Sequence, residues 1–297
     1  MGTPRFAGSM VALATPFRDG AIDWPAFGPM IERQIQEGSA ALVPCGSTGE
    51  SATLSHDEHR DVVRFVVEQA RGRVPVIAGT GSNATAEAIA LTRAARDAGA
   101  AGALMISPYY NKPTQEGLVA HYRAVADAVD LPLILYNIPG RTASRIEAET
   151  VARLAEHPNV VGLKEADPSL DHALDVVHLC GDAIELYAGD DSVTFSLMAL
   201  GGTGVISTVA NVAPRAMADL AAACRAGDWT TGRARQLALL PLIRACFTET
   251  NPIPLKYALA RLGFCRDEMR LPLTPLADAA KRDRLDRTLR DLGLLVP

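Results

Sequence analysis

The chain has 297 residues, of which 48% are hydrophobic, enough to bury the core of one large domain or of two ordinary ones. Its net charge of −5 comes from scattered charges, which argues against a nucleic-acid-binding protein, because such proteins cluster basic residues on one face. No apolar stretch approaches the roughly 18 residues of a membrane span, and the five cysteines, without a CxxC pair, indicate reduced thiols in a cytoplasmic protein.

Short apolar runs recur along the chain, with helical segments between them. They are rich in Val, Ile and Leu rather than alternating with polar residues, as is typical of parallel strands buried on both faces. We expect eight strands, at residues 9–14, 40–45, 74–79, 101–107, 131–137, 160–164, 184–189 and 204–208.

The segments between these runs carry helix signals. Ser55 and Glu58 form the capping-box pattern, which predicts the start of a helix. Residues 85–97 are rich in Ala and are followed by Gly99, and residues 147–156 end before Pro158. From residue 214 onward only helices are expected, among them 214–226, 229–248 and 252–262.

Eight strands, each followed by a helix, predict a TIM (β/α)8 barrel with a C-terminal helical appendage. We expect residues 1–213 to form the catalytic barrel and residues 214–297 to pack on it as a helical region. In such barrels the catalytic residues lie at the C-terminal ends of the strands. Lysine, hydroxyl-bearing residues and glycine turns occupy those ends here.

Lys164 ends the apolar run 160–163, and Tyr136 ends the preceding run. Burial disfavours an ammonium ion, so a lysine in this position has a lowered pKa and offers a neutral amine. Such an amine attacks ketones to form a Schiff base, and a nearby phenol can move protons. Arg141 offers a planar fork that matches a carboxylate. Together these residues indicate a lysine-dependent aldolase that acts on a keto acid.

The turn 46–49 reads Gly-Ser-Thr-Gly, with two hydroxyls and free backbone N–H groups. Such a turn can hold a carboxylate, which would make the ketone substrate a 2-oxo acid. Gly79 and Gly81 loosely match a dinucleotide-binding motif, but the next strand lacks the acidic residue that would bind the ribose.

Three further segments indicate a function only weakly. His56 and His59 lack metal-binding spacing and a third ligand, so they read as the first turn of a helix. Asp190 and Asp191 could bind Mg²⁺, although a turn that shapes the barrel mouth fits better. The segment Asn251–Lys256 would carry chemistry only if the tail folds back toward the barrel.

The chain resembles the dihydrodipicolinate synthase / N-acetylneuraminate lyase family of class I pyruvate aldolases over essentially its whole length. The motifs that carry the resemblance are GSTGESATLSHDEH, VIAGTGSNATAEAI, SPYYNKPTQEG, YNIPGRT, GLKEAD, AGDD, GVIS and NPIPLKYA. Arg141 favours the synthase branch, which joins pyruvate to L-aspartate-4-semialdehyde to begin diaminopimelate and lysine synthesis. The sialic-acid lyase branch lacks an arginine after YNIP.

The resemblance implies a role for each matching residue. Lys164 would form the Schiff base and Tyr136 would transfer protons. Ser47, where the synthase usually has Thr, would link Tyr136 to Tyr110 of the neighbouring subunit, so the site would need at least a dimer and usually a homotetramer. Thr48 would bind the pyruvate carboxylate, Arg141 would bind the semialdehyde carboxylate, and Gly189 and Ile206 would line the pyruvate pocket.

The resemblance also implies feedback inhibition by L-lysine, bound at a subunit interface. No metal or organic cofactor is expected, because the catalytic lysine is both nucleophile and electron sink. The positions that match the inhibitor site are Ser51, Ala52, His56, His59, Asn83, Glu87 and Tyr109.

Three alternatives remain open from the sequence. A sister aldolase would keep Lys164 and Tyr136 and use another aldehyde, and a metal-dependent aldolase would not form a pyruvate imine. A non-catalytic barrel would bind lysine without turnover.

Overall fold

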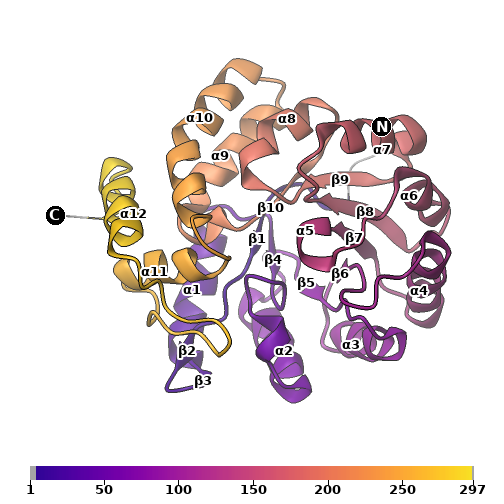
Figure 1. Cartoon of the computed structure of the whole chain (residues 1–297), viewed down its shortest axis with the longest axis horizontal. Coiled ribbons are helices and arrows are strands. Elements are labelled where there is room, and N and C mark those ends of the chain that lie inside the picture. The colour runs from indigo at the N-terminus through magenta and orange to yellow at the C-terminus, as the bar shows by residue number, and fades with distance from the viewer. Residues whose placement is uncertain (1–4, 296–297) are drawn as a thin grey trace.

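The computed structural model describes residues 5–295 and contains one closed parallel barrel (Figure 1). Its eight-stranded sheet has the order β4-β1-β10-β9-β8-β7-β6-β5. A parallel bridge between Leu42 and Val76 joins the two end strands and closes the ring. The strands are β1 (Gly8–Ala12), β4 (Ala41–Val43), β5 (Ile77–Gly79), β6 (Gly102–Ile106), β7 (Leu133–Asn137), β8 (Val160–Glu165), β9 (Glu185–Ala188) and β10 (Gly204–Ser207).

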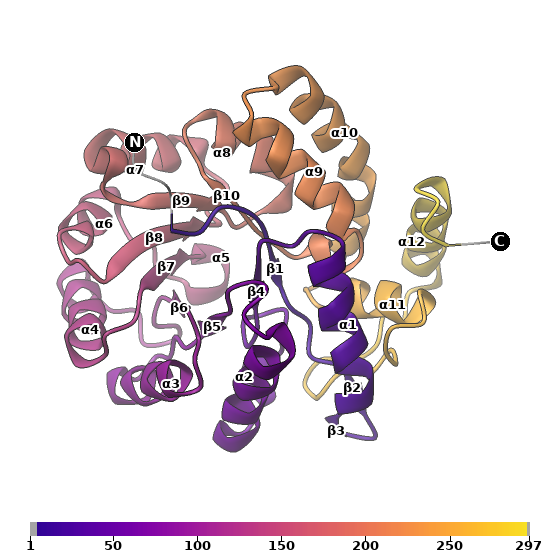
Figure 2. The same ribbon diagram turned by 180° about the vertical axis from the view of Figure 1, so that it is seen from behind.

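All eight predicted strands are present, and helices cover the outside of the barrel in both views (Figures 1 and 2). The capping box of Ser55 and Glu58 opens α2 as predicted. The outer helices are α1 (Trp24–Gln36), α2 (His56–Ala70), α3 (Thr85–Asp97), α4 (Gln115–Ala128), α6 (Ala148–Ala155), α7 (Leu170–Cys180), α8 (Thr194–Ala199) and α9 (Pro214–Arg225).

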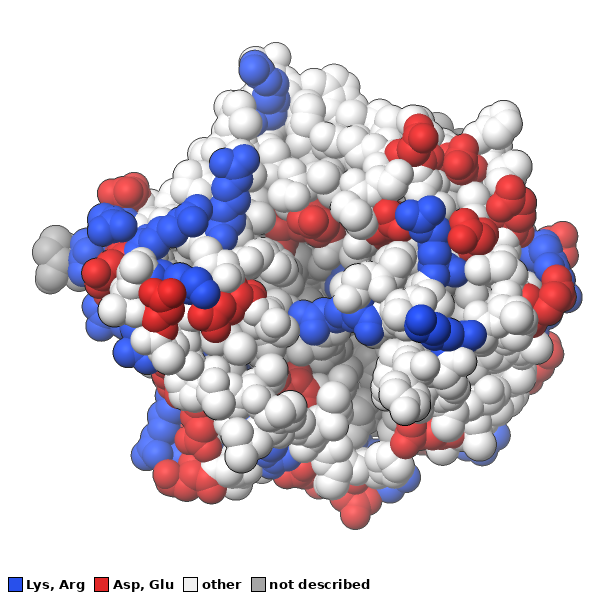
Figure 3. Space-filling view, in the orientation of Figure 1, with Lys and Arg blue, Asp and Glu red and all other residues white. Residues whose placement is uncertain are grey.

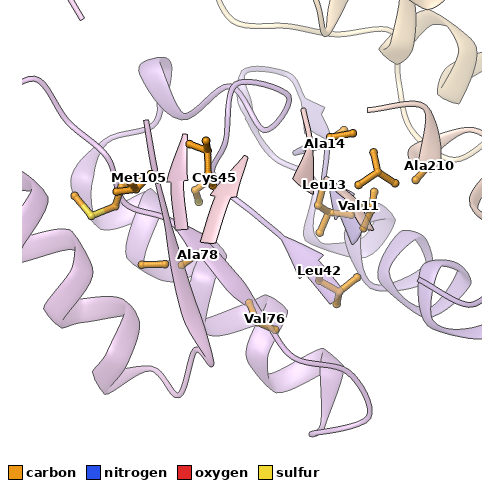
Figure 4. Close-up of a cluster of buried hydrophobic side chains, with 14 of the residues drawn as sticks. Val11, Leu13, Ala14, Leu42, Cys45, Val76, Ala78, Met105 and Ala210 are labelled. Carbon is orange, nitrogen blue, oxygen red and sulfur yellow. The ribbon is translucent and has the colours of Figure 1, made fainter. Parts of the chain in front are cut away.

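The strands are apolar on both faces because each face meets a different part of the core. Along β1, Met10 and Ala12 point into the barrel, and Val11 between them points toward the helices. Figure 4 shows the outer layer, where Val11, Leu42 and Val76 lie between the sheet and the helices. This two-sided burial explains why the strand sequences do not alternate between apolar and polar residues.

Short elements at the mouth of the barrel shape the site. The hairpin of β2 (Phe17–Arg18) and β3 (Ala21–Ile22), which the sequence analysis missed, lies between β1 and α1. Two residues at its turn, Asp19 and Gly20, have positive φ. The one-turn helix α5 (Pro139–Thr142) follows β7 and carries Arg141. The turns η1 (Ser51–Thr53), η3 (Asp191–Val193) and η4 (Val209–Asn211) also follow strands at this end, whereas η2 (Gly181–Ala183) precedes β9 at the opposite end.

The tail after α9 is helical and consists of α10 (Trp229–Cys246), α11 (Ile253–Arg261) and α12 (Ala279–Asp291). It folds back onto the barrel, where the fully buried amine of Lys256 is ion-paired with Glu50 at the end of the Gly-Ser-Thr-Gly turn. Within residues 5–295, no helix combines the length and apolar character needed to cross a membrane. The division at residue 214 stays a prediction, and its outer limits, residues 1–4 and 296–297, lie outside the described residues.

Candidate active site

Lys164 lies near the C-terminal end of β8, beside Tyr136 of β7 in the strand register. Its side chain is buried, with a relative exposure of 5%, and its amine nitrogen lies 4.2 Å from the centroid of the Tyr136 ring. Burial lowers the pKa of Lys164 to about 8, Asp191 opposes this shift, and Arg141 adds to it. About a tenth of the amine is therefore neutral at pH 7, far more than for an ordinary lysine, and this neutral form is the nucleophile.

Tyr136 brings a phenol proton to the side of this amine. Burial raises its pKa to about 12, although Arg141 and the Ser47 side chain act in the opposite direction. The residue therefore holds its proton at neutral pH and can donate it to an oxygen that gains charge. An amine that loses its proton easily and a phenol that keeps its proton therefore lie side by side.

The Gly-Ser-Thr-Gly turn is fixed by its close approach to the strands. A Cβ at Gly49 would lie 3.0 Å from the backbone oxygen of Leu13, so a larger residue would require the turn or Leu13 to shift by a few tenths of an ångström. The buried Thr48 hydroxyl accepts a hydrogen bond of 2.9 Å from the Asn251 side-chain nitrogen, and it lies 3.5 Å from the Thr208 hydroxyl. The turn thus presents Thr48 within a defined polar network.

Gly189 follows β9 and Ile206 lies within β10, the two strands between β8 and β1 in the sheet order. A Cβ at Gly189 would lie 2.8 Å from that of Ala166, so only glycine fits there without displacement. Ile206 is fully buried in the barrel interior, in the same apolar cluster as Tyr136. Both predicted pocket residues therefore border the barrel interior near the Lys164 strand.

Asp191 is a buried acid that the sequence analysis considered only as a Mg²⁺ ligand or a turn residue. Its carboxylate accepts hydrogen bonds from the backbone N–H groups of Thr208 and Val209, at 3.0 and 3.1 Å. Burial raises its pKa to about 6. It connects the end of β9 to the turn after β10 and places a negative charge near Lys164. Across residues 5–295, no three His, Cys, Asp or Glu side chains are arranged to hold a metal ion.

Arg141 lies at the rim of the mouth, where its guanidinium donates a 3.0 Å hydrogen bond to the backbone oxygen of Asn251. Asn251 comes from the tail, so the fold-back that the sequence analysis left as a condition occurs. Figure 3 shows the face of the molecule drawn in Figure 1, with a hollow near its middle and positive side chains beside it.

The predicted inhibitor residues gather next to this site. A side-chain nitrogen of His56 lies 2.6 Å from the Glu87 carboxylate, and the Ser82 hydroxyl donates to the same carboxylate. The ring of His59 is buried and lies 2.7 Å from the Gly79 carbonyl oxygen, and burial lowers its pKa. A cavity of about 440 Å³ borders this cluster. Among its lining residues are Ser51, Ala52, His56, His59, Glu87 and Tyr109, together with Ser47, Tyr136 and Arg141.

Six of the predicted residues are not among those that line this cavity: Lys164, Thr48, Gly189, Ile206, Tyr110 and Asn83. Tyr110 is 92% exposed, and its φ of 74° lies in the left-handed region that non-glycine residues rarely adopt. Asn83 contributes its backbone oxygen to a hydrogen bond from the Asn111 side chain. Within one chain, Tyr110 therefore points into solvent rather than toward Tyr136.

A sequence model of the Dihydrodipicolinate synthetase family matches residues 5–292, nearly the whole chain. The chain belongs to this family. One family member, the 4-hydroxy-tetrahydrodipicolinate synthase of Geobacter sulfurreducens, is 56% identical over 276 residues, which cover 93% of this chain and 95% of that protein. The protein is therefore a lyase with the barrel fold of the dihydrodipicolinate synthetase family.

Solved structures of the family superpose closely on this chain. The chloride-inhibited dihydrodipicolinate synthase of Acinetobacter baumannii, complexed with pyruvate, matches with a TM-score of 0.96 and 44% identity, covering 98% of this chain and all of that one. The enzyme of Cyanidioschyzon merolae with lysine bound matches with a TM-score of 0.95 and 37% identity, covering 99% of this chain and all of that one. The predicted (β/α)8 fold is confirmed.

The sequence analysis missed the roles of two residues. Asp191 lies near Lys164 and affects its pKa, and Asn251 donates a hydrogen bond to Thr48. Asp191 lies at a predicted strand end, so its position could have signalled a functional charge. Asn251 lies outside every strand, and only its tail-to-barrel contacts bring it to the mouth.

Proposed function

We propose that the protein condenses pyruvate with L-aspartate-4-semialdehyde, the reaction of 4-hydroxy-tetrahydrodipicolinate synthase. The observation that carries this proposal is the pairing of a lysine amine of lowered pKa with a protonated tyrosine at the end of neighbouring strands. The identity to curated synthases over almost the full chain supports it.

Lys164 would attack the keto carbon of pyruvate, and loss of water from the adduct would give an imine. Loss of a proton from the methyl group would give an enamine, whose carbon would attack the aldehyde carbon of the second substrate. Tyr136, in a relay with Ser47 and a partner's Tyr110, would carry the protons, including one to the aldehyde oxygen. The amine of the semialdehyde would then displace Lys164 and close the ring.

The substrate carboxylates would be held at two places. Thr48 would bind the pyruvate carboxylate through its hydroxyl and its turn, while Gly189 and Ile206 would line the pocket around the imine. Arg141, exposed at the rim, would bind the carboxylate of the semialdehyde through its planar fork. A sister aldolase with another aldehyde remains the second candidate, because Lys164 and Tyr136 would serve either substrate.

A subunit partner would complete the site. The Tyr110 ring is exposed and is held on a left-handed residue, so it suits insertion into a neighbour's site. We therefore propose a homo-oligomer, most simply a tetramer built from two dimers.

The five cysteines, unpaired within the described residues, support the predicted cytoplasmic location.

L-lysine is proposed as the feedback inhibitor. The Glu87 carboxylate lines the cavity, where it would meet an ammonium group of lysine, and the same cavity reaches Tyr136 and Arg141. The lysine-bound relative supports this assignment. Replacing Glu87 with Gln should raise the lysine concentration that halves the rate, while the rate without lysine stays near that of the wild type. Equal sensitivity in the variant would place the inhibitor elsewhere.

The experiment that tests the function is a turnover assay with purified protein, pyruvate and L-aspartate-4-semialdehyde, coupled to the downstream reductase through loss of NADPH. The synthase assignment predicts turnover with both substrates and suppression by L-lysine. Absence of turnover in protein that borohydride still traps with pyruvate would keep the lysine chemistry and assign another aldehyde. Absence of both would refute the proposal.

A further inference from the structure

Asn251 occupies a position between the two predicted carboxylate-binding residues. It comes from the tail just before α11, yet the residue is only 6% exposed at the barrel mouth. Its side-chain nitrogen donates to the Thr48 hydroxyl at 2.9 Å, and its backbone oxygen accepts from Arg141 at 3.0 Å. One residue thus contacts a pyruvate-binding and a semialdehyde-binding group of the proposed function.

The direction of the bond to Thr48 has a chemical consequence. A threonine hydroxyl has one proton, which it can donate, and two lone pairs, which can accept. Because the Asn251 amide donates to one lone pair, the proton of Thr48 need not point to Asn251. The remaining neighbour of this hydroxyl, the Thr208 hydroxyl, lies at 3.5 Å, the limit of hydrogen bonding. The Thr48 proton is therefore available to a substrate carboxylate.

The side-chain oxygen of Asn251 is buried and makes no hydrogen bond to any described residue. A buried polar atom without a partner is costly, so its retention at this place is consistent with a role that requires the amide. A carboxylate in its place would accept a hydrogen bond from the Thr48 hydroxyl, and it would also repel a substrate carboxylate.

Resting on the proposed function, we propose that Asn251 is a positioning residue for pyruvate, which acts by keeping the Thr48 hydroxyl oriented as a donor to the pyruvate carboxylate. The tail segment is then part of the substrate site and not only a cover on the barrel. The backbone contact with Arg141 is independent of the side chain, so side-chain substitutions should separate the two substrates.

The test measures the pyruvate concentration that gives half-maximal trapping by borohydride, a reading that needs no aldehyde. Asn251→Ala should raise this concentration about tenfold, because it removes one hydrogen bond to a group that binds a charge. Asn251→Asp should raise it about a hundredfold at pH 8. The maximal extent of trapping should be unchanged, and in Asn251→Ala the KM for the semialdehyde should stay close to the wild-type value.

The pH dependence of the aspartate variant provides a second measurement, which a merely structural role of Asn251 would not affect. A protonated carboxyl group can donate to Thr48 as the amide does. The ratio of the half-saturating concentration in Asn251→Asp to that in the wild type should therefore fall several-fold between pH 8.5 and pH 5.5, because effects of pH on Lys164 are common to both proteins.

The matched control is Asn159→Asp, the same change in an amide next to the start of β8, where the side chain donates to the Ala126 carbonyl oxygen. It should leave pyruvate trapping unchanged. If Asn251→Asp does not fold, the effect of Asn251→Ala on pyruvate trapping is measured in protein that already carries Thr48→Val. Because the Thr48 hydroxyl is then absent, the alanine change should not raise the half-saturating pyruvate concentration further. Wild-type behaviour of Asn251→Asp, or equal effects of Asn251→Ala in both backgrounds, would overturn the inference. A wild-type protein that pyruvate and borohydride do not modify would instead refute the proposed function.

Discussion

The buried amine of Lys164 should lower the stability of the folded protein, and replacing it with Met should raise it. Met has a similar length and no charge, so it fits the apolar surroundings that lower the lysine pKa. The pKa falls from the model value of 10.5 to about 8 on folding. Each pKa unit corresponds to about 1.4 kcal/mol, so the ammonium form costs about 3 kcal/mol of folding free energy near pH 7.5.

The pH dependence of this difference follows from the direction of the shift. A depressed folded-state pKa means that the unfolded chain binds the proton more tightly. The wild type should therefore lose stability relative to Lys164→Met as pH falls from about 10.5 through about 8, and the difference should level off below that. Asp191, whose pKa is about 6, titrates mostly below this window.

The assay is denaturant unfolding of both proteins at pH 7.5 and at pH 10.5. The predicted advantage of Lys164→Met is larger at pH 7.5 by about 3 kcal/mol, which corresponds to roughly 5 °C or more in Tm. Lys112→Met, a change at an exposed lysine, is the control and should show no such dependence. A Lys164→Met advantage that stays constant between the two pH values would refute the reasoning about the buried amine.

Three further predictions concern the reaction. The rate of pyruvate imine formation should rise with pH and level off above about pH 8, as Lys164 loses its proton. Asp191→Asn should move this rise to lower pH, because the Asp191 charge favours the ammonium form. An unchanged pH profile in Asp191→Asn, measured by borohydride trapping, would contradict that coupling. Tyr136→Phe should lower kcat by roughly 10²–10⁴-fold, since it removes a proton donor, and should still form some trapped pyruvate adduct; near-normal kcat in the coupled assay would remove Tyr136 from the chemistry. Arg141→Ala should raise the KM for the semialdehyde by about tenfold or more while pyruvate trapping stays intact, because a bidentate ion pair is lost; a selective rise in the pyruvate KM would assign Arg141 to the other substrate.

The barrel could be predicted from the sequence because burial on both faces leaves a simple pattern. Most of each strand is apolar, so each appeared as a short run rich in Val, Ile, Leu and other apolar residues between helical segments. The hairpin at β2 and β3 gave no such signal, since each of its strands has only two residues. Strand ends then placed Lys164, Tyr136 and Asp191 at one mouth without any knowledge of their contacts.

The contribution of the tail could not be predicted in this way. Asn251 and Lys256 reach the barrel mouth through contacts with Thr48 and Glu50, more than 200 positions earlier in the chain. No local pattern specifies such a contact, and proline near a helix start has an ordinary structural explanation. The role of Tyr110 depends on a second subunit, so a single sequence indicates it only through resemblance to the family.

The most direct test of the central claim is chemical trapping of the proposed imine. Purified protein would be incubated with pyruvate and borohydride, digested, and mapped by mass spectrometry. The account predicts a reduced pyruvate adduct on the peptide that contains Lys164, and none on that peptide in Lys164→Met. An unmodified Lys164, or an adduct confined to another lysine, would contradict the claim that this residue is the nucleophile.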